Sequence, residues 1–326
     1  MTETLQKRCE LFIQNRNAIK SAFGWESTYI YPICAEIFTA NGVLADTAQM
    51  KNCFDLLKEK TTLFSNFRGT ARMATVSALC LCDDPGQKLD QMISVYDSLK
   101  EVFWGSEYLA MAATSIAQLA QPSDYHQIAQ KTREIYNRMK ASHPFLTSGE
   151  DSAFAALLAM SGLDDLYIEQ EMERCYNILK PSFFSGNAVQ ALSHVLALGE
   201  GSAEDKCAKA LDLFDCLKSR GYKYGTSYEL PTLGALVLID ADINALAEEM
   251  ISVDDYLKAQ KGFGALGVGA RQRLMYAGML AVNEHIPNVQ TMQAAALSGI
   301  VALIVAEQAA VCAAIVATSA AAASSN

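Results

Sequence analysis

The sequence predicts an all-α protein made of tandem helical hairpins of about 40 residues each. A lysine preceded by Ile, Leu or Met recurs at intervals of 38 to 42 residues, at Lys20, Lys58, Lys100, Lys140, Lys180, Lys218 and Lys258. An aromatic residue and a glycine follow each lysine, as a helix stop and a turn would. No stretch alternates apolar and polar residues with a period of two, so strands are not expected.

Each lysine ends the first helix of a hairpin. In the clearest copy, residues 84–105, Asp84 and Pro85 open an amphipathic helix and Lys100 lies in its last turn. The first two copies begin after Thr2 and Asp46. In the other copies an N-cap residue is predicted sixteen residues before the lysine, at Asp84, Asp124, Asp164, Ser202 and Asp242. Three tyrosines share one position in this helix and should be buried, namely Tyr96, Tyr136 and Tyr176.

The second helix of each hairpin is apolar on most of its faces. The seven copies are predicted at residues 26–38, 70–81, 107–120, 151–161, 187–198, 228–239 and 271–283. A helix that is apolar all round belongs inside the protein, and its amphipathic partner belongs at the surface. Seven hairpins of this kind form either a curved solenoid or a closed α/α toroid. The contrast between the two helices favours closure or tight curvature.

Two domains are predicted. Residues 1–286 form the hairpin array, and residues 287–326 form an alanine-rich apolar helix with a small-residue tail. The segment 294–317 is long enough to span a bilayer, but Glu307 and Gln308 near its centre offset the gain from its branched apolar residues. We therefore expect this helix to dock on the array or on a second copy in a homo-oligomer. A membrane association remains the alternative.

Composition and charge narrow the class of function. The chain has 326 residues, 51% of them apolar, with a net charge of −10. Its sequence pI is about 5.0 and it shows no basic stripe, which argues against nucleic acid as a partner. Nine cysteines without paired spacing suggest a reducing, cytoplasmic setting. The four histidines are scattered over different hairpins, so no metal site is predicted, and no cofactor can be named.

The starts of the inner helices carry the candidate catalytic acids, Glu107, Glu150, Asp151 and Glu229. In either architecture they share one rim, and in a toroid they would converge on the mouth of the central space. Paired carboxylates at that place can perform acid–base chemistry. The alternative is that these residues are ordinary polar residues at interhelical turns.

A glycine-rich loop is the candidate ligand site. Gly264, Gly267 and Gly269 precede Arg271 and Arg273, and Arg72 begins another inner helix. The loop follows a helix and not a strand, which argues against a dinucleotide fingerprint. A helix N-terminus with nearby arginines can still bind an anionic ligand through free N–H groups. The alternative is a plain turn.

The run from Phe67 to Arg72, the Tyr-x-x-Leu-Lys repeats, and Gly262-Phe263-Gly264 resemble a bacterial family known only as a domain of unknown function, numbered 4003. The resemblance implies that one domain covers nearly the whole chain, and it implies no activity. From the residues we expect a binding or scaffold protein whose partner is another protein or a small ligand, with an anion as one candidate. An enzyme of α/α-toroid type and a membrane-associated structural protein are the alternatives.

Overall fold

The structure is a computed structural model, and it describes residues 1–239, 241–264, 267–282 and 284–285. Within these residues it contains fourteen α-helices and no strand, so the all-α prediction is confirmed. The odd-numbered helices are α1 (Glu3–Ala22), α3 (Thr47–Lys60), α5 (Pro85–Lys100), α7 (Tyr125–Ser142), α9 (Asp165–Leu179), α11 (Ala203–Ser219) and α13 (Ile243–Lys258). The even-numbered helices are α2 (Ile30–Ala40), α4 (Arg72–Cys80), α6 (Glu107–Leu119), α8 (Asp151–Met160), α10 (Gly186–Leu196), α12 (Leu230–Val237) and α14 (Ala270–Val282).

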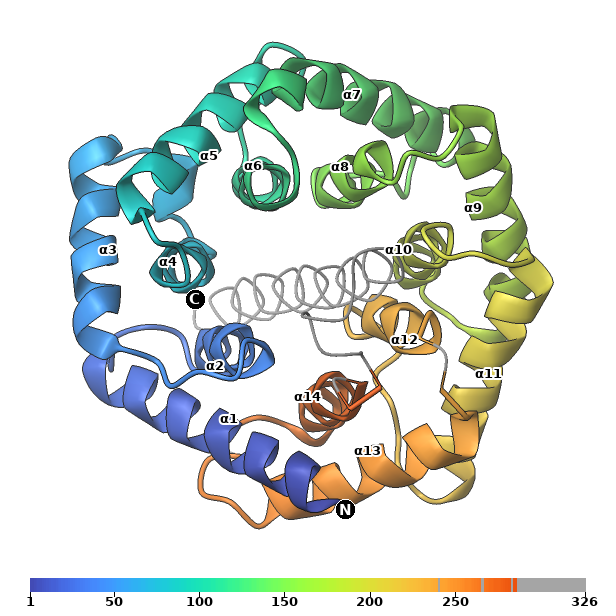
Figure 1. The fold of residues 1–326 in the computed structure, drawn as a ribbon. Coiled ribbons are helices and arrows are strands. Elements are labelled where there is room, and N and C mark those ends of the chain that lie inside the picture. Colours follow the sequence, from blue (N-terminus) through green and yellow to red (C-terminus); the bar gives the residue numbers. More distant parts are fainter. Residues whose placement is uncertain (240, 265–266, 283, 286–326) are drawn as a thin grey trace, which may run out of the picture.

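The odd-numbered helices lie around the outside of the molecule, and the even-numbered helices lie inside them (Figure 1). Each outer helix contacts the inner helix that follows it in the chain. The pattern of burial explains the two layers. Helix α2 buries every residue from Ile30 to Thr39, whereas α5 buries only one apolar stripe that ends at Leu99. The amphipathic helices therefore take the surface, as the sequence predicts.

Local signals place most helix starts correctly. The N-cap side chains of Asp46, Asp84, Asp164 and Asp242 accept hydrogen bonds from first-turn amides, and so does that of Ser202.

Two starts differ from the prediction. Asp124 makes no cap, because it ends the 3₁₀ helix η2 (Pro122–Asp124), which runs directly into α7. Helix α2 begins at Ile30 and not at residue 26, because the Tyr31 hydroxyl donates to the Phe23 and Glu26 carbonyls and holds a turn there.

Ring contacts join each of the first five helix pairs to the next. A ring-bearing residue in the loop after an outer helix stacks on an aromatic residue of the following outer helix, with ring centroids 4.2 to 6.2 Å apart. The five pairs are Phe23–Phe54, Phe67–Tyr96, Phe103–Tyr136, His143–Tyr176 and Phe183–Phe214. Of the three tyrosines predicted to be buried, Tyr96 is buried, and Tyr136 and Tyr176 are only half-buried.

The two ends of the described chain also meet. Phe12 of α1 lies 5.8 Å from the rings of both Phe263 and Tyr276, and the Arg16 guanidinium lies 5.2 Å from the centre of the Phe263 ring. Arg8 forms an ion pair with Glu284 at 2.6 Å. Helix α14 contacts α1 and α2, which brings the last helix pair against the first (Figure 1).

The described helices are all too short or too polar to cross a bilayer. The apolar segment 294–317, the residues Glu307 and Gln308, and the predicted domain boundary at 287 lie outside the described residues.

Candidate functional site

The N-termini of the inner helices lie side by side at one rim of the molecule, as their mutual contacts show. Arg72 at the start of α4 reaches Glu26 before α2, and Glu107 at the start of α6 reaches Thr70 before α4. Asn187 of α10 bonds to Glu150 before α8. We call the loops that precede the inner helices the N-terminal rim; their described residues are 23–29, 61–71, 101–106, 143–150, 183–185, 220–229, 259–264 and 267–269. The predicted catalytic acids lie here, as expected, but in different environments.

Arg72 is part of a paired site. Its Nη2 atom lies 2.8 Å from both carboxylate oxygens of Glu26, and its Nε atom donates to Glu26 at 3.0 Å. It also donates to the Arg68 carbonyl at 3.2 Å. A guanidinium bound in this way is largely satisfied by the protein itself. Arg72 therefore joins the first two inner helices.

Glu107 and Glu150 have similar linking roles. The Glu107 carboxylate accepts from the Thr70 amide at 2.7 Å and lies against the Cα of Gly69, where a side chain would collide with it. Glu150 accepts from the Asn187 amide group at 3.1 Å, and partial burial raises its pKa. Each carboxylate thus bridges two neighbouring inner helices.

Asp151 lies beside a histidine that the sequence analysis did not single out. Its Oδ1 atom is 3.4 Å from Nδ1 of His194 on α10, and its Oδ2 atom accepts from the Ser148 amide at 2.7 Å. Both side chains are buried. Burial raises the pKa of Asp151 to about 7; burial first, and then the charge of His143, lower that of His194 to about 3. Between these values both groups are neutral, so the short distance is not a salt bridge.

This pair predicts an unusual pH dependence. Folded Asp151 keeps its proton from its ordinary pKa of 3.8 up to about 7, which makes the chain less stable as the pH rises. Folded His194 stays neutral between its lowered pKa of about 3 and its ordinary pKa of 6.5, whereas the unfolded chain binds a proton there. The chain therefore becomes more stable as the pH rises through this range. The two slopes oppose each other in their shared window. In urea unfolding, the stability of His194→Gln should therefore fall as the pH rises from about 4 to 7, whereas that of the unmodified chain should change less over the shared window.

The control is the reciprocal change, Asp151→Asn, which should gain stability with rising pH over the window of His194. Parallel pH profiles for both variants and the unmodified chain would show that neither group has a shifted pKa.

Glu229 is the predicted acid whose carboxyl group has an oxygen left without a hydrogen-bond partner among the described residues. Its side chain is buried, the unpartnered oxygen is Oε2, and burial raises the pKa of the carboxyl group. Gly225 lies against this carboxyl group and leaves no room for a side chain of its own. The positive charge of Arg271, which is exposed, acts in the opposite direction on the pKa of Glu229.

The glycine-rich loop is held from two sides. The guanidinium of Arg273 is buried, bonds to both oxygens of Asp254 at 2.8 and 3.0 Å, and donates to the Phe263 carbonyl at 2.9 Å. Arg16 packs against Gly262, which has a φ of +92°. Within the loop, the Gly267 amide donates to Gly264 and the Val268 amide donates to Gly262. Gly264 and Gly269 have open space around Cα. Arg273 is committed to Asp254, so of the two arginines only Arg271 faces solvent.

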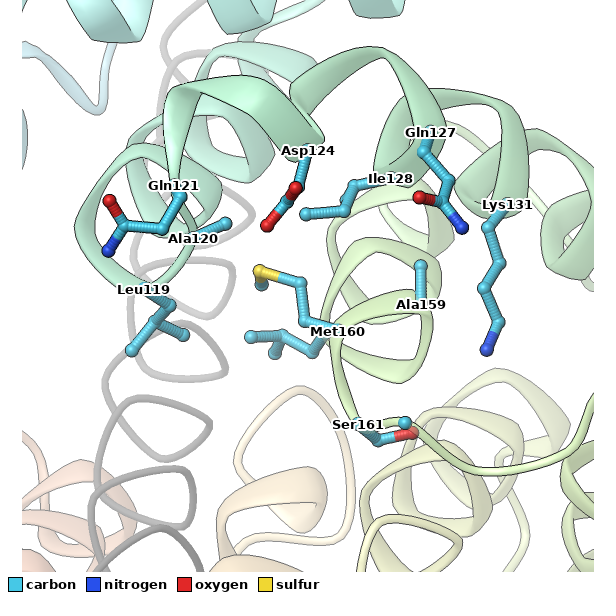
Figure 2. A pocket seen from close by; sticks show the side chains of 12 residues that line it. Leu119, Ala120, Gln121, Asp124, Gln127, Ile128, Lys131, Ala159, Met160 and Ser161 are labelled. Atoms are coloured by element: carbon cyan, nitrogen blue, oxygen red, sulfur yellow. The ribbon is translucent and has the colours of Figure 1, made fainter.

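The opposite rim contains a pocket that no sequence signal indicates. Figure 2 shows it between the end of α6, the start of α7 and the end of α8. Its volume is about 470 Å³, within the usual range for small-molecule sites. The wall is mostly apolar, and it is formed by Leu119, Ala120, Ile128, Leu157, Ala159, Met160 and Gly162. The polar side chains are Gln121, Asp124, Gln127, Lys131 and Ser161. Because the residues come from three different helices, the folded structure brings them together and no local sequence pattern reveals the pocket.

In the described part of the chain, no group of three His, Cys, Asp or Glu side chains is placed to hold a metal ion, and the eight cysteines there are free thiols.

Comparisons with known proteins agree with the extent of the fold. The chain is 22% identical over 318 residues to the uncharacterized protein YeaA of Bacillus subtilis, covering 95% of this chain and 94% of YeaA. A second similarity, also 22% identical, covers 51% of this chain and only 8% of oxygen-regulated protein 1 from Canis lupus familiaris. No solved structure matches. Residues 15–309 match the family described as protein of unknown function DUF4003, and the chain therefore belongs to that family.

Proposed function

We propose that this protein is a binding protein built on seven α/α hairpins that close into a toroid. The stacking contacts support closure. Phe54 and Tyr96 each lie four residues before the repeated lysine and receive the ring of the preceding hairpin. Arg16 occupies that position before Lys20 and receives Phe263 of the last hairpin. The same contact therefore runs from each of the first five hairpins to the next, and from the seventh to the first.

The binding role is favoured over the enzyme alternative because most of the predicted acids accept hydrogen bonds within the protein. Glu107, Glu150 and Asp151 accept bonds that join loops and helices, and Arg72 and Arg273 are bound to carboxylates. An acid–base pair needs groups that are free to exchange protons with a substrate. These side chains instead form contacts between elements of the protein itself.

The pocket at the ends of α6 and α8 carries the proposal. Its apolar wall fits the apolar part of a small molecule, and its charged side chains indicate which charge the polar end of that molecule should carry. Lys131 is occupied, since it donates to the Leu163 carbonyl at 2.9 Å and lies 3.4 Å from Asp165. The Asp124 carboxylate, which lies at the pocket (Figure 2), accepts a hydrogen bond only from the Ser123 hydroxyl among the described residues. The local charge is thus negative, which favours a small apolar molecule with an amine or neutral polar end.

The test is binding of the uncharged fluorophore N-phenyl-1-naphthylamine and its displacement by octylamine or octanoate. We expect saturable binding at one site, with octylamine displacing the dye at about tenfold lower concentration than octanoate, equivalent to about 1.4 kcal/mol. Ala120→Trp should fill the pocket and abolish the binding.

The matched control is Ala40→Trp, which places the same ring on a half-buried alanine at the end of α2. This variant should bind the dye like the unmodified chain. Unchanged binding by a folded Ala120→Trp variant would show that the dye binds elsewhere and would remove the support for this site.

A further inference from the structure

Five aromatic side chains of the N-terminal rim point into solvent. The exposed fractions are 68% for Trp25, 92% for Phe64, 96% for Trp104, 98% for Phe145 and 100% for Phe184. Each comes from a different hairpin, in the loop between the outer and the inner helix of the first five hairpins. They differ from the stacked aromatic residues of the same loops, which pack against the next hairpin. Trp25 touches Phe23 of its own loop edge-on, with ring centroids 5.8 Å apart, and packing within the described chain does not account for the exposure of the five rings.

The charges of the molecule are divided between the two rims. The described loops after the inner helices, residues 41–46, 81–84, 120–124, 161–164, 197–202, 238–239 and 241–242, contain seven acids and no Lys or Arg. Beside the N-terminal rim lie the lysines that end the outer helices, of which Lys20, Lys58, Lys100, Lys140, Lys218 and Lys258 are exposed. Lys58 pairs with Asp55 at 3.0 Å and Lys100 lies 3.9 Å from Asp97, whereas the other four form no ion pair among the described residues. Lys223, Lys261 and Arg271 add exposed cations in the two hairpins that lack an exposed aromatic residue.

Three of the four acids of the N-terminal rim have a partner within the protein or are buried. Glu26 is paired with Arg72, Glu150 is bonded to Asn187, and Glu229 is buried with a raised pKa. Glu101 is exposed. Helix capping explains why acids lie at the starts and lysines at the ends of the outer helices. It does not explain why tryptophan and phenylalanine should stand in solvent beside those lysines.

We propose that the N-terminal rim docks on the surface of an anionic lipid bilayer. Exposed Trp and Phe side chains next to Lys and Arg are the combination that membrane interfaces accept, since the rings enter the headgroup region and each cation near the surface contributes about 1 kcal/mol. The five rings are distributed one per hairpin along the rim, so a flat surface meets them together. A protein partner would be expected to meet a compact cluster.

The net charge of −10 does not prevent this docking. The inner helix α2 has 11 residues, which corresponds to a rise of about 16 Å between the two rims. That separation is about twice the Debye length of roughly 8 Å in physiological salt, so the acidic rim is screened from the membrane.

The chain carries its own reporter for this contact. It has two tryptophans, Trp25 and Trp104, and both lie on the N-terminal rim. With the full chain and vesicles of phosphatidylcholine plus phosphatidylglycerol, we expect co-flotation and a blue shift of the tryptophan emission. Both should be absent with phosphatidylcholine alone and should weaken as salt is added.

Two variants locate the contact. Replacement of Trp25, Phe64, Trp104, Phe145 and Phe184 by Ser should reduce the affinity for anionic vesicles by at least about tenfold. The matched control replaces Val43, Leu44 and Leu166, which are exposed at the acidic rim, by Ser and should leave binding unchanged. All these positions are exposed, and circular dichroism verifies that each variant is folded.

Three results would overturn the proposal. Failure of the full chain to bind either kind of vesicle would exclude the membrane and leave a protein as the partner of this rim. Flotation without a tryptophan shift would place the contact elsewhere in the chain. Equal binding by the five-residue variant would do the same.

Discussion

Phe12→Ala should lower the free energy of unfolding by about 3 to 5 kcal/mol, as truncation of a fully buried phenylalanine does. Phe12 is fully buried, and its ring lies 5.8 Å from those of Phe263 and Tyr276. These three residues belong to the first and the last helix pairs. The substitution thus leaves a cavity at the contact between the two ends of the described chain. The first and the last helix pairs are far apart in the sequence and meet there through side-chain contacts.

A double-mutant cycle tests whether Phe12 and Phe263 contribute to stability through their mutual contact or only through separate packing in the core. The loss caused by Phe12→Ala and Phe263→Ala together should differ from the sum of the single losses by about 0.5 to 3 kcal/mol, since the two rings are in contact. The control pairs Phe12→Ala with Phe183→Ala, a buried residue that stacks on Phe214 between the fifth and sixth helix pairs. That pair should be additive. Additive losses in both pairs would show that the two ends do not meet in solution.

The helices were predictable because their signals are local. An N-cap such as Asp84 or Asp242 acts within one helical turn, and the apolar stripe of an outer helix can be read within one segment. Asp124 shows the limit of such reading. The aspartate stands at the expected spacing, but Pro122 three residues into that loop begins a 3₁₀ turn that removes the need for a cap.

The rim of the candidate site was predictable, and the state of its residues was not. Hairpin order places Glu107, Asp151 and Glu229 at one end of the inner helices whatever their partners are. Whether a carboxylate is free or occupied depends on residues far away in the sequence. His194 lies 43 residues from Asp151, and no local pattern connects the two. The pocket of Figure 2 was missed for the same reason, because its wall is assembled from three helices.

Arg273 shows how the partner decides the role of a residue. The sequence presents a cation just after a glycine-rich loop, which suits an anion site. The structure gives that cation a buried carboxylate, Asp254, at 2.8 Å. We therefore expect Arg273→Met to lower the free energy of unfolding by about 3 to 5 kcal/mol, because Asp254 would remain buried without a counter-charge.

The double variant Arg273→Met with Asp254→Leu should recover most of that loss, since removal of both charges leaves no unpaired ion in the core. Arg174→Met is the matched control, because Arg174 pairs with Glu204 at 2.6 Å but both side chains are exposed. Its midpoint of urea unfolding should not change. A different outcome would favour the anion site: a small loss of stability in Arg273→Met, together with loss of any specific stabilisation of the chain by phosphate, would mean that Arg273 serves a ligand and not Asp254.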